Sequence, residues 1–174
     1  FDVVDLEGHL PSLSGIHVVV QSGSAAQLMF VDGYEPTDVV AGALMPEVRV
    51  VLVDSFANPV TSPGLQIGLQ ITEPQGLPPL RVVAPAENGM ARFSTLRFET
   101  AATYRLIAVL DLINAEDLYS EPSQPFEVEP DVPTQLTLAL PPLNLDREQT
   151  AGVLWNAFAV ELRDAFNNVV LWDN

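Results

Sequence analysis

The chain has 174 residues, and its 23 acidic and 7 basic residues, all of the latter arginine, give a formal net charge of −16. This charge repels nucleic acid phosphates and anionic lipid surfaces, so we expect neither as a partner. Hydrophobic residues make up 48% of the chain, enough for a packed core. No apolar run approaches the roughly 18 residues that a membrane span needs.

Short stretches of alternating apolar and polar residues follow one another along the chain, with the period of half-buried β-strands. In chain order, the pattern predicts strands at 27–30, 48–52, 65–72, 80–84, 90–98, 104–110 and 125–129. Turn residues separate them, and 15 prolines argue against long helices. About seven short strands at this spacing predict an all-β fold of the β-sandwich type.

The chain also repeats itself. Nine residues recur in the same order 110 positions later. They are Ala41, Gly42, Leu44, Val50, Leu52, Asp54, Phe56, Asn58 and Val60. Upstream, Gln27 and Leu28 recur 108 positions later. An ordered series of identities at nearly constant spacing indicates a repeat of about 108–110 residues, the size of one small domain.

This period divides the chain into three parts. We expect residues 1–22 to be the C-terminal strands of one repeat, 23–130 to be a complete repeat, and 131–174 to be the N-terminal strands of the next. Phe1 falls inside the pattern, so we expect the chain to be a processed or partial segment.

Several motifs resemble those of bacterial immunoglobulin-like domains, the tandem modules of invasin- and intimin-type surface proteins; filamin repeats share a similar plan. The motifs are the Ala-Gly pair at 41–42 and the series at 48–60, 89–96, 101–106 and 123–128. The resemblance implies an immunoglobulin-like β-sandwich in tandem repeats. Two turns depart from the family pattern, because Ala57 and Asn167 stand where glycine is usual.

Two pairs of polar residues recur at the ends of expected strands. Asp54 and Asp164 each follow an inward-facing apolar series, and Asn58 and Asn168 lie four residues further on. A short carboxylate at a strand end accepts backbone N–H bonds in a turn, and Asn tolerates left-handed backbone. We therefore assign these residues structural roles, with a cation site as the alternative.

Three aromatic residues also receive structural roles. Tyr104, at the start of a late strand, matches the position of a tyrosine corner, whose hydroxyl hydrogen-bonds to the backbone. Phe56 and Phe166 lie in the two turns that carry the repeated acids. We expect each phenylalanine to cap the end of a sandwich.

An acidic run lies where one repeat would pass into the next. Glu127, Glu129 and Asp131 are candidate ligands for Ca²⁺, which binds six to eight oxygens. The equivalent positions at the other junction, Val19 and Gln21 among them, carry no acid. A solvated acidic edge is therefore the alternative, and we expect no other cofactor.

Motifs of catalysis are absent from the sequence. It has no cysteine, no Gly-x-Ser-x-Gly elbow and no phosphate-binding glycine-rich loop. Its two histidines, His9 and His17, both lie in the first partial repeat. Paired carboxylates suited to glycoside hydrolysis are the one enzymatic alternative, and a sandwich of short loops offers them no obvious cleft. We expect a protein that is not an enzyme.

The sequence favours a structural segment of a stalk or adhesin, outside a bacterial cell or on its surface, whose partners are neighbouring repeats. Two alternatives remain open. In the first alternative, the end pieces at 1–22 and 131–174 are donated to neighbouring copies, and the copies build an extracellular filament. In the second, loops at 74–79 or 111–121 recognise a glycan or a receptor.

Overall fold

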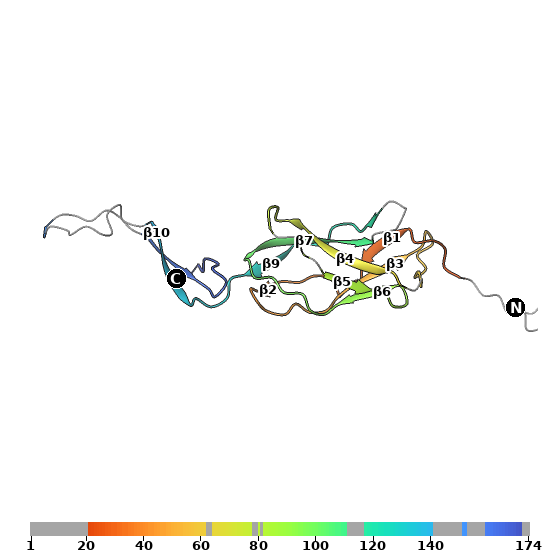
Figure 1. The fold of residues 1–174 in the computed structure, drawn as a ribbon, viewed down its shortest axis with the longest axis horizontal. Helices are drawn as coiled ribbons and strands as arrows, with labels where there is room; N and C mark the ends of the chain where they lie inside the picture. Colours follow the sequence, from red (N-terminus) through yellow and green to blue (C-terminus); the bar gives the residue numbers. More distant parts are fainter. Residues whose placement is uncertain are drawn as a thin grey trace, which may run out of the picture.

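The computed structural model describes residues 21–61, 64–77, 80, 82–110, 117–140, 151–152 and 159–171. In these ranges the structure is all-β, with eleven strands and no helix (Figure 1). The strands are β1 (Gln27–Phe30), β2 (Val39–Val40), β3 (Val48–Val53), β4 (Gln66–Glu73), β5 (Val82–Pro85), β6 (Met90–Phe93), β7 (Ala102–Leu110), β8 (Leu118–Tyr119), β9 (Phe126–Glu129), β10 (Gln135–Leu140) and β11 (Ala159–Arg163). Accordingly, this part of the chain offers no helix of the length and hydropathy required to cross a membrane.

Strands β1 to β9 form two sheets that enclose one core, as in a β-sandwich (Figure 1). The smaller sheet has the order β1-β3-β6 and is antiparallel. The larger sheet has the order β2-β9-β7-β4-β5, with β8 paired to β7. Only the short pairing of β2 with β9 is parallel among the strand pairs of these two sheets. The predicted all-β, sandwich-like fold is therefore confirmed.

The core is built from the inward-facing residues of both sheets. Side chains alternate between the two faces of a strand, so every second residue of β3 and β7 faces the core. These residues are Val48, Val50, Leu52, Tyr104, Leu106, Ala108 and Leu110, and none is more than 2% exposed. Burial of each larger apolar side chain among them stabilises the fold by about 1.5–3 kcal/mol.

Some strands differ from their predicted positions. β2 and β8 have two residues each, too few for alternation to reveal. The strand predicted at 90–98 ends at Phe93, although Leu96 and Phe98 remain buried. The backbone N–H groups of Met45 and Gly42 donate to the carbonyls of these two residues, at 3.0 and 2.8 Å. Residues 96–98 therefore pair with the loop at 42–45 and do not continue β6.

After β9, residues 130–134 lead into a separate pair of antiparallel strands, β10 and β11. Figure 1 shows this pair beyond the end of the sandwich at which β9 lies. Its register matches that of β1 and β3: Gln27 lies opposite Val53, and Gln135 lies opposite Arg163. Its apolar residues are exposed, with Leu136 at 71% and Val160 at 49%, because no second sheet covers them in the described ranges.

Three aromatic rings pack together at the end of the core from which the chain leaves. The centroid of the Phe98 ring lies 4.8 Å from that of Tyr104 and 5.4 Å from that of Phe126. Tyr104 is 2% exposed, and its hydroxyl donates to the carbonyl of Thr100 at 2.8 Å. Burial raises the pKa of Tyr104, so the hydroxyl keeps its proton and remains a donor. The bond fixes the loop that leads into β7.

Replacing Tyr104 with Phe removes this hydroxyl and leaves the ring in place. We expect the free energy of unfolding to fall by about 1 kcal/mol, the usual contribution of one intramolecular hydrogen bond. Urea titration followed by circular dichroism measures the change. Tyr34→Phe is the matched control, because the Tyr34 ring is 38% exposed and lies on the outer face beside Arg49. Equal losses in the two variants would contradict the role of the Tyr104 hydroxyl.

Candidate functional site

The turn after β3 is built around one carboxylate. Asp54 is 4% exposed, and its Oδ1 accepts the backbone N–H groups of Phe56 (2.8 Å) and Asn58 (2.9 Å). Its Oδ2 accepts the backbone N–H of Gly23 (2.8 Å) and the side-chain amide of Asn58 (3.1 Å). We call residues 54–58 the Asp54 turn. One side chain both closes this turn and holds the segment that leads into β1.

The turn after β11 has the same construction. Asp164 is fully buried, and its Oδ1 accepts the backbone N–H groups of Phe166 (2.9 Å) and Asn168 (2.8 Å). Its Oδ2 accepts the backbone N–H of Asp131 (3.0 Å) and the side-chain amide of Asn168 (2.8 Å). We call residues 164–168 the Asp164 turn. Each of these four hydrogen bonds of the first carboxylate therefore has a counterpart at the second, 108 or 110 residues further along.

Each turn contains a residue with left-handed backbone that is not glycine. Ala57 has a φ of 62° and Asn167 a φ of 71°. Their N–H groups donate to the carbonyls of Asp54 and Asp164, at 3.1 and 3.2 Å. Asn adopts this conformation readily, whereas the Cβ of alanine makes it cost about 1–2 kcal/mol. The Asp54 turn therefore stores strain at Ala57.

Hydrogen bonding lowers the pKa of both carboxyl groups. The pKa of Asp54 is about 2, below its usual 3.8, because the backbone N–H groups of Gly23 and Asn58 donate to it. Burial acts to raise the pKa of Asp164, but the hydrogen bonds that it accepts, from the Asn168 side chain foremost, outweigh burial and lower it. Both groups are therefore ionised at neutral pH and act as acceptors.

The Asp164 turn contacts the preceding sandwich at the end where the chain leaves it. The side-chain amide of Asn168 donates to the carbonyl of Glu99 (2.8 Å), and its oxygen accepts the N–H of Ala101 (2.8 Å). The ring of Phe166 lies so close to Gly42 that a Cβ there would overlap it. Gly42 also has a φ of 77°, which favours glycine. We call Gly42, Glu99 and Ala101 the receiving surface.

The Asp54 turn makes no comparable contact within the described part of the chain. Phe56 is 83% exposed, whereas Phe166 is 37% exposed. Within the described residues, Phe56 therefore does not cover the end of the sandwich to which it belongs, and its capping role stays a prediction. Its backbone N–H is directed to Asp54, and its ring projects from the turn into solvent. Phe166 instead lies against the end of the sandwich that precedes it.

The acidic run suggested as a Ca²⁺ site is not gathered around one point. Glu127 and Glu129 are exposed residues of β9. The carboxylate of Asp131 accepts the N–H of Val132 at 2.7 Å. In the ranges covered by the structure, no three Asp, Glu or His side chains are grouped as ligands for a metal. A Ca²⁺ site at these residues stays a prediction.

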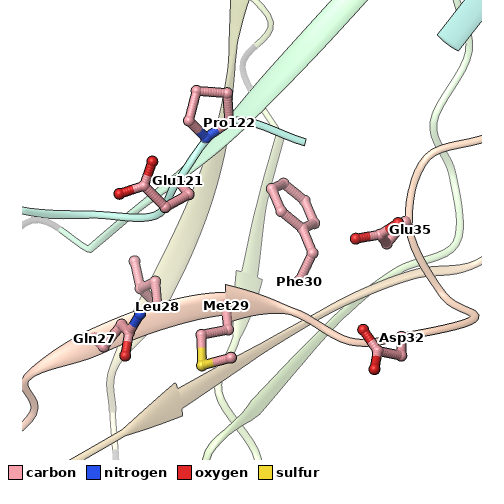
Figure 2. A pocket seen from close by; sticks show the side chains of 8 residues that line it. All are labelled: Gln27, Leu28, Met29, Phe30, Asp32, Glu35, Glu121 and Pro122. Atoms are coloured by element: carbon pink, nitrogen blue, oxygen red, sulfur yellow. The ribbon is translucent and has the colours of Figure 1, made fainter. Parts of the chain in front are cut away.

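A small hollow lies beside β1 and has a cavity volume of about 230 Å³. Figure 2 shows the ring of Phe30 between Pro122 and Glu35, with Glu121 beside Pro122. This volume is below the roughly 300–1,000 Å³ of pockets that enclose small molecules. The loops suggested for glycan or receptor recognition, at 74–79 and 111–121, include residues outside the described ranges.

A scan against protein-family models, a search of curated proteins and a search of solved structures found no match to this chain. The function must therefore be argued from the geometry of the two turns and of the receiving surface.

Sequence reasoning identified the residues of both turns but missed the receiving surface. Glu99 and Ala101 contribute only backbone atoms, so their side chains carry no signal. Gly42 did carry one, because an Ala-Gly pair recurs at 151–152. A recurring glycine indicates a special backbone conformation or a close approach, without naming what approaches.

Replacing Asp54 with Asn tests the role of the ionised carboxylate. The pKa of Asp54 is lower in the folded chain, about 2 against 3.8, so ionisation stabilises the fold above pH 4. That stabilisation is lost as the pH falls toward 2. We expect Asp54→Asn to be less stable than the parent at pH 7, with a difference that shrinks between about pH 4 and pH 2. Urea unfolding at a series of pH values measures the difference.

Glu87→Gln is the matched control for Asp54→Asn, because it also removes one carboxylate but from an exposed side chain. We expect its stability to follow that of the parent over the same pH range. A loss in Asp54→Asn that stayed constant down to pH 2 would show that the carboxylate does not act through its charge.

Replacing Ala57 with Gly relieves the left-handed strain in the first turn. We expect the free energy of unfolding to rise by up to about 1 kcal/mol, because the relief exceeds the extra entropy of glycine in the unfolded chain. Ala57→Asn copies the second turn and is expected to stabilise as well. Thermal and urea unfolding measure both. Ala43→Gly, at an exposed position without left-handed backbone, is expected to give no gain.

Proposed function

We propose that the chain is a segment of a tandem array of immunoglobulin-like domains that serves as a structural, non-enzymatic stalk or adhesin. The observation that carries the proposal is the double occurrence of the carboxylate-centred turn. Asp54 and Asp164 accept equivalent sets of hydrogen bonds, and each turn follows a strand pair of the same register. Equal local structure at the spacing of the sequence identities supports repeats of one domain, with 23–130 as the complete copy.

The strand orders support the immunoglobulin-like assignment. In that fold, the first, second and fifth strands share one sheet, and the third, sixth and seventh share the other. The order β1-β3-β6 fits the first group, and β9-β7-β4 fits the second, with β5 added beside β4. The Tyr104 hydroxyl bonded to Thr100, four residues upstream, fits the tyrosine corner of the same fold.

A stalk requires that neighbouring domains be held in line, and the passage between them is short. Residues 130–134 separate β9 from β10, and Pro130 and Pro133 restrict their backbone. The N–H of Asp131 is held by Asp164, and the N–H of Val132 by the Asp131 side chain. Little free chain therefore remains at the junction to act as a flexible linker.

The location proposed for the array is outside a bacterial cell or on its surface, as in the invasin- and intimin-type proteins that the sequence resembles. Antibodies raised against the chain should label intact cells. Treatment of intact cells with a protease should remove the epitope. An epitope that remains protected until the cells are lysed would contradict this location.

A second proposed function is a filament subunit, and one observation favours it. The apolar residues of β10 and β11 are exposed, including Leu138 at 46% and Leu136 at 71%. Such a face needs a cover, which the remainder of a following domain supplies in a stalk. In a filament, the strands of a neighbouring copy supply it by strand donation.

The denatured mass of the protein from its natural source distinguishes the two functions. A tandem array predicts a mass well above the 18.9 kDa of this chain. Mass spectrometry after denaturation measures it free of non-covalent partners. A mass near 18.9 kDa would contradict the array and favour the filament.

A further inference from the structure

The two ends of the complete repeat carry the two halves of one contact. At the end where the chain leaves, the receiving surface is occupied by Phe166 and Asn168. At the opposite end, Phe56 and Asn58 occupy the same positions in the Asp54 turn, but no described residue covers them. Phe56 is 83% exposed against 37% for Phe166.

The hydrogen bonds of the two asparagines show the same difference. Both side-chain amides bond to the carboxylate of their own turn, at 3.1 Å for Asn58 and 2.8 Å for Asn168. Asn168 additionally bonds to Glu99 and Ala101 across the junction. Asn58 has no bond of this second kind among the described residues and is exposed. Its amide nitrogen is therefore held by Asp54, and its side-chain oxygen has no partner among the residues that the structure describes.

A third observation concerns the glycine of the receiving surface. Gly152 corresponds to Gly42 in the repeat, and both have left-handed backbone, with φ of 89° and 77°. A Cβ on Gly42 would overlap the ring of Phe166, whereas no described atom lies within 4 Å of one on Gly152. The next repeat thus keeps the space that an approaching ring requires.

We propose that Phe56 and Asn58 are a docking surface for the receiving surface of a second copy of the repeat, in the arrangement that Phe166 and Asn168 adopt on Gly42, Glu99 and Ala101. This inference rests on the proposed tandem array and adds the residues that join its members. The contact is heterologous, because different surfaces of each copy meet. It therefore propagates along a line of copies and does not close into a pair.

The test uses an extended chain that contains two complete repeats. Residues 1–134 are followed directly by residues 27–174, which keeps the native passage at 131–134 and places the Phe56 of the second repeat where Phe166 now lies. Gln70, exposed on β4, is replaced by Cys in each repeat. The chain has no other cysteine, so spin labels attach at these two positions alone.

We expect pulsed electron paramagnetic resonance to give one narrow distribution of distances between the labels. Phe56→Ala in the second repeat should at least about double its width, because neighbouring domains move freely unless an interface holds them. The same substitution in the first repeat, where the ring faces solvent, is the matched control and should change nothing. A broad distribution in the parent, or no broadening in the second-repeat variant, would overturn the proposal.

Amide hydrogen exchange provides a second readout. Docking predicts that the Ala101 N–H of the first repeat donates to Asn58 of the second. Asn58→Ala in the second repeat should accelerate exchange at that amide about tenfold, the loss of about one hydrogen bond. Unchanged exchange would contradict the docking geometry.

Circular dichroism and urea unfolding of the extended chain separate this inference from the proposed function. Two folded repeats with a broad distance distribution would overturn the docking and leave the array in place. A second repeat that fails to fold would contradict the array itself. If Phe56→Ala in the first repeat unfolded that repeat, the ring would be needed within its own domain, which would also overturn the docking.

Discussion

The rest of the structure depends on a buried carboxylate that accepts backbone N–H groups from two segments of the chain. A tight turn leaves several N–H groups without strand partners, and each costs about 1–3 kcal/mol if it is buried without an acceptor. Asp54 accepts three such groups, and Asp164 accepts three. In each case one of the donors, Gly23 or Asp131, lies just before the first strand of the pair that the turn follows, β1 or β10. The side chain that closes the turn therefore also determines where the chain enters the sheet.

At the other end of the sandwich, Tyr104 has a comparable effect on the receiving surface. Its hydroxyl holds the carbonyl of Thr100, the residue between the two that bond to Asn168. A carbonyl and an N–H two residues apart match the amide of asparagine, which carries one acceptor and two donors. The buried aromatic cluster thus keeps the loop in the shape that presents both groups to the next turn.

The features that the sequence predicts are local ones. The alternation of apolar and polar residues predicted which side chains of β3 and β7 face the core, because successive side chains of a strand point to opposite faces. The repeated identities marked Asp54, Phe56 and Asn58 because each has a fixed place in one turn. The shortest strands, β2 and β8, were missed because two residues show no period.

The contact at the junction could not be predicted for a different reason. It joins side chains of one turn to backbone atoms far away in the sequence, and Glu99 and Ala101 contribute nothing of their side chains to it. The sequence predicted that Phe56 caps the end of a sandwich, but it did not indicate which sandwich. Alternation within one domain gives no information about a surface that a different domain covers.

The chemistry of the junction suits a protein of such strong negative charge. In the proposed array, neighbouring domains that each carry many carboxylates would repel one another. A contact made of charged groups would require basic residues, of which the chain has only 7 against 23 acids. The groups that meet where the Asp164 turn contacts the receiving surface are uncharged. They are the phenyl ring of Phe166 against Gly42, and the amide of Asn168 against two backbone groups. The carboxylate at the centre of the contacting turn, that of Asp164, is buried and accepts hydrogen bonds from its own turn and from the N–H of Asp131. In the proposed array, a neutral contact of this kind would hold acidic domains in line with few added charge–charge contacts, and salt would weaken it little.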